Sequence, residues 1–169
     1  MVKSPPQLLF VVLATLVSVG AAGIGAQSGT SSRRPTVLFM CPHGAAKSVM
    51  ASAYFQKLAK ERGLNVRVDA AGTDPEPQLS KGVVARLQRD GVAIPIDKPR
   101  AATNADMKAA DIVISIGCDL SKLATPTGEM RNWNVPDFSA NFDVAAQSIR
   151  DQVTRLVDEL VASQKKKGR

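Results

Sequence analysis

Hydrophobic and polar positions along the chain follow two alternating periods, one typical of strands and the other typical of helices. Apolar or alternating runs predict buried strands at residues 37–40, 65–71, 111–116 and 130–135. Apolar residues at helical spacing predict helices at residues 48–62, 80–90, 104–110 and 142–162. Residues 92–100 are interrupted by prolines, which predicts a loop or a weak edge strand. This alternation predicts an α/β fold with three layers, α/β/α, around a four-stranded, parallel, doubly wound sheet.

One apolar run, at residues 8–25, fits neither period because it is uncharged and almost continuously hydrophobic. It predicts an export signal over residues 1–26, with cleavage after Ala22 or Ala26, where small residues gather. The run also reaches the lower length limit of a membrane-spanning helix, so an uncleaved N-terminal anchor is the alternative. A buried core helix is a third interpretation. We therefore expect an exported, periplasmic protein, or one that residues 8–25 anchor to a membrane.

Length and charge define the rest of the organisation. The 169 residues are enough for one domain, which we place at residues 36–163, after a polar, flexible lead-in at residues 27–35. The formal net charge is +7, and part of it lies in a solvated basic tail at residues 164–169. This charge is compatible with an anionic substrate. Aromatic residues make up only 4% of the chain and no recognition motif is visible, so we expect no nucleic acid partner.

The segment that follows the first predicted strand carries the most chemistry. Cys41 ends the strand, a loop of small residues follows, and the helical pattern begins at Ser48. In a strand, loop and helix of this kind, backbone N–H groups point into one concavity at the helix N-terminus, where a tetrahedral anion can bind. The positive field there would favour the thiolate form of Cys41, which is the nucleophile. A thiolate beside an anion site is the outline of covalent catalysis.

The same segment carries a family resemblance. Cys-Pro-His-Gly-Ala-Ala-Lys-Ser at residues 41–48, followed by Met50 and Ala51, resembles the phosphate-binding loop of the low-molecular-weight tyrosine phosphatase superfamily. Its arsenate reductase branch is the closer one. Further stretches resemble the family in the same order along the chain, at residues 70–73, 110–114, 117–118 and 133–137. The resemblance covers about residues 35–162 and implies the same three-layer fold.

The resemblance implies a role for each site residue. Cys41 would attack phosphorus or arsenic, and the Ser48 hydroxyl would donate to its thiolate, with a helix N-cap as the alternative role of Ser48. Asp137 would be the general acid, with a solvated turn residue as the alternative. We expect the side chain of His43 to point away from the anion. The oxyanion-binding loop would comprise Pro42, His43, Gly44, Ala45, Ala46, Lys47 and Ser48.

Three departures from the family pattern affect the expected activity. Lys47 stands where the family has arginine, so a point charge replaces a planar fork. We expect catalysis to be slower by about 10²–10³-fold, the loss typical of one preorganised donor. Phe138 follows Asp137 where the reductases have proline, which would shift the acid loop. Thioredoxin-linked reductases use three cysteines, whereas this chain has two.

The second cysteine, Cys118, matches the second cysteine of the reductases. Cys41 and Cys118 follow strands that are neighbours in a doubly wound sheet, so a disulfide between them is geometrically feasible. We expect this disulfide in the exported protein, and two independent thiols are the alternative. With one histidine and two cysteines, no metal site is expected.

Three functions remain open at this stage. The first is an arsenate reductase-like enzyme that needs a thiol reductant or thiol-redox partner but no other cofactor. The second is a phosphatase that acts on phosphotyrosine or another phosphomonoester. The third is a non-catalytic protein that binds phosphate or arsenate, which Lys47 favours. All three share a small oxyanion or a phosphorylated group as the ligand.

Overall fold

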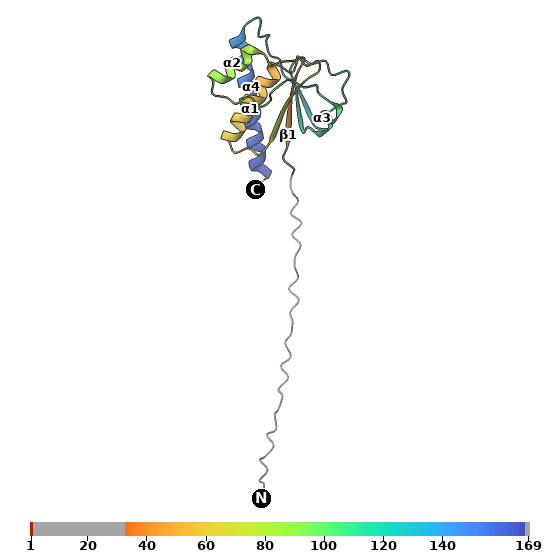
Figure 1. Cartoon of the computed structure of the whole chain (residues 1–169), viewed down its shortest axis with the longest axis vertical. Helices are drawn as coiled ribbons and strands as arrows, with labels where there is room; N and C mark the ends of the chain where they lie inside the picture. The colour runs from red at the N-terminus through yellow and green to blue at the C-terminus, as the bar shows by residue number, and fades with distance from the viewer. Residues whose placement is uncertain (2–32, 168–169) are drawn as a thin grey trace. The chain divides into compact units, whose positions relative to one another are not determined.

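The computed structural model describes Met1 and residues 33–167 (Figure 1). The predicted export signal or anchor and most of the predicted lead-in lie outside the described residues. Among the residues that are described, no helix is both long and apolar enough to cross a membrane. Every core residue lies at or after Val37, so the domain contains its complete hydrophobic core.

A parallel sheet forms the middle layer of the domain. Its strands lie in the order β2-β1-β3-β4, which is the doubly wound order expected from the sequence. β1 and β3 pair directly, with Met40 opposite Ser115, while β2 pairs with the other side of β1. The strands are β1 (Thr36–Cys41), β2 (Arg67–Gly72), β3 (Ile112–Ser115) and β4 (Glu129–Asn132).

Helices cover both faces of the sheet, as Figure 1 shows. Their bounds are α1 (Lys47–Glu61), α2 (Lys81–Arg89), α3 (Asn104–Ala109) and α4 (Phe142–Lys167). The larger core lies between the sheet and the helices α1, α2 and α4, and it includes Phe39 and Phe55. The smaller core includes Met40 and Met107 and lies under α3. The three layers predicted from the sequence are therefore present.

Two elements differ from their predicted bounds. α4 continues to Lys167, so the expected basic tail at residues 164–169 begins as helix. Lysine and glutamine are good helix formers, and positive charge at a helix C-terminus is favourable, so nothing in this stretch stops the helix. β4 ends at Asn132 rather than at residue 135. The Trp133 N–H still donates to the Ser115 carbonyl, and the chain then leaves the sheet towards Pro136, which cannot donate to a ladder.

Candidate active site

Cys41 is the last residue of β1 and is nearly enclosed, with 3% of its surface exposed. The chain turns immediately after it, and the Gly44 N–H donates to the Cys41 carbonyl at 3.3 Å. Gly44 has a φ of +60°. A Cβ atom at this position would lie 2.7 Å from the backbone nitrogen of Gly72, at the end of β2. The sequence predicts only that the backbone is left-handed here; the structure shows that the neighbouring strand also excludes any side chain.

The loop is held from outside by the segment that follows β2. The carbonyls of Pro42, His43 and Ala45 accept N–H groups from Asp74, Glu76 and Ser80, at 2.8, 3.0 and 3.0 Å. Among the described residues, the backbone N–H groups of residues 45–48 have no acceptor. Carbonyls that are bonded outwards and amides that are left free are the polarity that an anion needs.

Ser48 lies within the first turn of α1 and is completely buried. Its hydroxyl oxygen is 3.1 Å from the Cys41 sulfur. The N-cap position of the helix is Ala46, so the alternative role of Ser48 as a helix cap is wrong. A buried hydroxyl beside a thiolate can donate a hydrogen bond to it, which favours the charged sulfur.

Lys47 reaches across the site to the segment after β4. Its ammonium donates to the Val135 carbonyl at 3.1 Å and to the Asp137 carboxylate at 2.8 Å. The lysine side chain is only 18% exposed, whereas that of Asp137 is 77% exposed. The hydrogen bond and charge of Lys47 lower the pKa of Asp137, so the carboxyl group is ionised near neutral pH. Both residues predicted for the site are therefore brought together, but as an ion pair with each other.

Aromatic side chains fix the segment that carries Asp137. Trp133 packs edge-on against Phe39 of β1, with ring centroids 5.5 Å apart. Phe138 stacks on Phe142 at the start of α4, with ring centroids 4.6 Å apart. The residue after Asp137, which departs from the family pattern, therefore anchors this segment to the helix that follows.

Cys118 lies just beyond β3, the strand next to β1, and it is partly buried. Burial raises the pKa of its thiol to about 11, and the nearby Cys41 contributes to the rise, while a hydrogen bond with Ser115 opposes it. Both cysteines are free thiols in this structure. The disulfide between them is absent here and stays a prediction for the oxidised protein.

The raised pKa gives a measurable reactivity. In a Cys41→Ser variant, alkylation of Cys118 by iodoacetamide should accelerate about tenfold per pH unit up to a pH near 11, because only the thiolate reacts. The rate is measured by mass spectrometry over a pH series, with a small model thiol as the control. A plateau near pH 8 would show that the environment of Cys118 does not raise its pKa.

His43 lies on the outside of the loop, as expected. Its side chain is 59% exposed, and its Nδ1 atom is 3.8 Å from the carboxylate of Glu76. Among the described residues, no group of three His, Cys, Asp or Glu side chains could hold a metal ion. The supporting segment at residues 74–80 was missed at the sequence level, because its contribution is made through backbone groups that any residue supplies.

Comparison with known proteins extends the resemblance to the whole domain. The family model for low molecular weight phosphotyrosine protein phosphatase matches residues 36–167. A curated arsenate reductase homologue from Halobacterium salinarum is 26% identical over 124 residues, which are 72% of this chain and 87% of that protein.

Two solved structures share the fold. The thioredoxin-dependent arsenate reductase Cg_ArsC1′ of Corynebacterium glutamicum has a TM-score of 0.65 and 28% identity over 77% of this chain, and the match spans 63% of that reductase. The arginine phosphatase YwlE, whose structure was solved as a mutant with a phosphorylated active-site serine, has a TM-score of 0.60 and 25% identity. That match covers 78% of this chain and 96% of the phosphatase, and YwlE comes from Bacillus subtilis.

Proposed function

Because the chain belongs to the low molecular weight phosphotyrosine protein phosphatase family, we propose that it is a cysteine-dependent oxyanion enzyme resembling arsenate reductase. The observation that carries this proposal is the position of the Cys41 sulfur. It lies 3.1 Å from a buried serine hydroxyl and at the edge of a loop whose amides are free. A nucleophile, a donor that stabilises its charged form, and donors for a tetrahedral anion are thus present at one point.

In the proposed reaction, the oxyanion binds to the loop amides and the Cys41 thiolate attacks its central atom. With arsenate, a sulfur–arsenic bond forms and a hydroxyl group leaves as water once it is protonated. Attack of a second thiol on the Cys41 sulfur then passes two electrons to arsenic, releases arsenite and leaves a disulfide. Cys118 is the candidate for this second thiol, and a small thiol or a thiol-redox protein would reduce the disulfide again.

The ion pair between Lys47 and Asp137 gives the acid step a condition. Asp137 must hold a proton to protonate the leaving oxygen, but Lys47 keeps it ionised in the free protein. We propose that the bound oxyanion draws the ammonium of Lys47 away from Asp137. The carboxylate would then lose its partner beside a new negative charge, and both changes raise its affinity for a proton.

Two alternatives keep their own supporting observations. A phosphatase that acts on phosphotyrosine or another phosphomonoester needs one cysteine and one acid, and this chain has only two cysteines in all. The similarity to an arginine phosphatase agrees with that reading. A non-catalytic oxyanion-binding protein is favoured by Lys47, whose ammonium already has two partners in the site.

Turnover assays separate these three functions. Arsenate reduction that requires an added thiol identifies the reductase. Hydrolysis of an aryl phosphate without thiol identifies the phosphatase, and binding of phosphate or arsenate without either reaction identifies the binding protein. The assays use the domain from Gln27 onwards, which contains the complete core.

Replacing Lys47 with arginine is expected to raise turnover by about 10²-fold, because a guanidinium donates to two oxygens of the transition state where lysine offers one point charge. The measurement is kcat with arsenate and with an aryl phosphate. Lys57→Arg is the matched control, since Lys57 lies on the same helix but is exposed and pairs with Glu61. An unchanged or lower kcat in Lys47→Arg would show that the site is adapted to lysine.

A further inference from the structure

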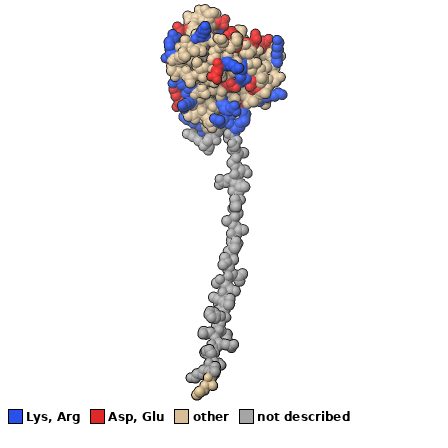
Figure 2. All heavy atoms as spheres, viewed as in Figure 1, with Lys and Arg blue, Asp and Glu red and all other residues tan. Residues whose placement is uncertain are grey.

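The edge of the sheet opposite Cys41 is a second surface with a strongly positive character. β1 and β2 begin at this edge, and α1 ends there. Arg62, just beyond α1, pairs with Asp158 of α4, so the last turns of α4 and their lysines continue past the same edge. Figure 2 shows basic side chains gathered where the described chain begins. We call this surface the basic end and define it by Arg34, Lys60, Arg67, Lys165 and Lys166.

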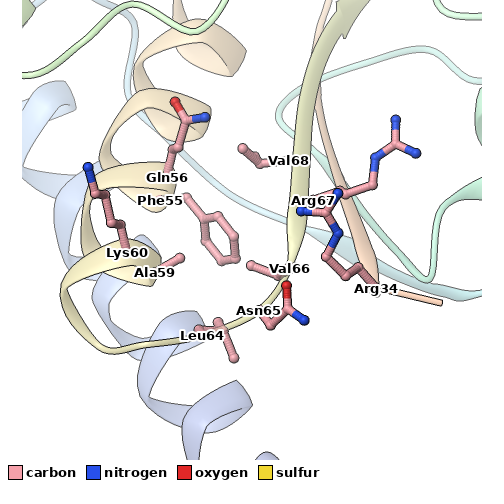
Figure 3. Close-up of a pocket in the computed structure, with 10 residues that line it drawn as sticks. All are labelled: Arg34, Phe55, Gln56, Ala59, Lys60, Leu64, Asn65, Val66, Arg67 and Val68. Carbon is pink, nitrogen blue, oxygen red and sulfur yellow. The ribbon is translucent and has the colours of Figure 1, made fainter. Parts of the chain in front are cut away.

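A groove lies within the basic end, between α1 and β2 (Figure 3). Its volume is about 450 Å³, and no carboxylate lines it. Three cations surround an apolar floor: Arg34, Lys60 and Arg67 are all exposed. The floor consists of Phe55, Ala59, Leu64, Val66 and Val68.

The positive charge of the groove is not compensated by nearby acidic residues. Within the described part of the chain, none of its three cations forms an ion pair. The carboxylates of Glu61, Asp158 and Asp111 at this edge each pair with a different cation, namely Lys57, Arg62 and Arg33. A compact group of unpaired cations above an apolar floor suits a ligand with phosphate groups next to apolar surface.

The sequence indicates which ligand of this kind is available. Only residues 26–32 separate the apolar run at residues 8–25 from Arg33, where the described chain begins. Seven residues span at most about 25 Å when fully extended. If the apolar run is held in a membrane, the end of the domain that carries Arg33 is held close to the lipid headgroups.

We propose that the basic end is a docking surface for an anionic membrane, and that the groove receives lipid phosphate groups. Basic side chains near an anionic surface strengthen binding by about fivefold each, within a screening distance of about 10 Å. Docking at this end leaves the opposite edge, with Cys41, directed away from the membrane and open to a soluble substrate. The proposal does not depend on which reaction Cys41 performs.

The test uses the domain from Gln27, without the apolar run, so that any membrane binding comes from the folded surface. It is sedimented with phosphatidylcholine vesicles and with vesicles that also contain phosphatidylglycerol, at low and at high salt. We expect binding only to the anionic vesicles, with release by salt. In the variant Arg34→Gln/Lys60→Gln/Arg67→Gln, the partition coefficient should fall about 100-fold.

The matched control lowers the net charge equally on other surfaces, as Arg89→Gln/Lys98→Gln/Lys122→Gln. All three of these side chains are exposed, and none forms an ion pair among the described residues. We expect this variant to lose less than about fivefold, the effect of one nearby charge. Thermal unfolding monitored by circular dichroism confirms that both variants fold.

Three results would overturn the proposal. The first is a domain that shows no preference for anionic vesicles, and the second is equal loss of binding in the two variants, which would reflect net charge alone. The third is tighter binding to a duplex oligonucleotide than to the vesicles at the same salt, with loss in the groove variant. That outcome would identify the basic end as a nucleic acid surface instead.

Discussion

Replacing Cys41 with serine is expected to lower turnover by about 10⁴-fold or more, with arsenate or with an aryl phosphate. The Cys41 sulfur is nearly enclosed and lies beside Ser48, so no other side chain among the described residues can take its position. A serine hydroxyl is not ionised near neutral pH and is a poor nucleophile and a poor leaving group here. The measurement is steady-state kcat/KM, with thiol reductant present for arsenate.

The control for this prediction is Cys118→Ser. If the enzyme is a phosphatase, this variant keeps its activity. If it is a reductase that uses both cysteines, this variant performs the first step but does not turn over. Activity that survives in Cys41→Ser would mean that the reaction takes place elsewhere on the molecule.

Replacing Gly44 with alanine is expected to abolish oxyanion binding and to lower the free energy of unfolding by about 2–5 kcal/mol. Two costs add together at this position. The backbone is left-handed, and the new Cβ would lie 2.7 Å from the Gly72 nitrogen, which is backbone and cannot turn aside. Either the loop or the end of β2 must move, and the amides of the loop then lose their arrangement.

Gly63→Ala is the matched control for that substitution. Gly63 also has a left-handed backbone, with φ of +66°, but a Cβ there meets nothing within 4 Å. We expect it to cost about 1–2 kcal/mol, which is the conformational term alone, and to leave oxyanion binding intact. The measurements are urea unfolding and calorimetric titration with phosphate. Equal effects of the two substitutions would show that the contact between Gly44 and Gly72 is not needed to shape the loop.

The sequence predicts the elements of this fold well because the pattern of each element is local. The apolar run before Cys41 and the helical spacing after Ser48 place the nucleophile at a strand end and the serine at a helix start. The parallel order of the strands follows from the alternation of elements. Cys41, Ser48, Lys47 and Asp137 could all be nominated before any coordinates were seen.

What the sequence could not predict depends on contacts between distant segments. The ion pair of Lys47 with Asp137 joins residues 90 positions apart, and its geometry depends on where the chain turns after β4. The exclusion of a side chain at Gly44 depends on the approach of Gly72 from the next strand. The lysine therefore has a consequence beyond the loss of a planar fork, because it also ties up the expected acid.

The central claim, that Cys41 attacks a bound oxyanion, is tested most directly by identifying what becomes attached to its sulfur. The reduced domain is mixed with an aryl phosphate or, separately, with arsenate in the absence of thiol, quenched in acid and mapped by peptide mass spectrometry. The account predicts a phosphoryl group on the Cys41 peptide in the first case, or a disulfide between Cys41 and Cys118 in the second, each dependent on the substrate. If phosphate or arsenate binds to the loop and yet Cys41 is recovered as an unmodified thiol from both reactions, the protein is an oxyanion-binding member of its family and the proposed chemistry is wrong.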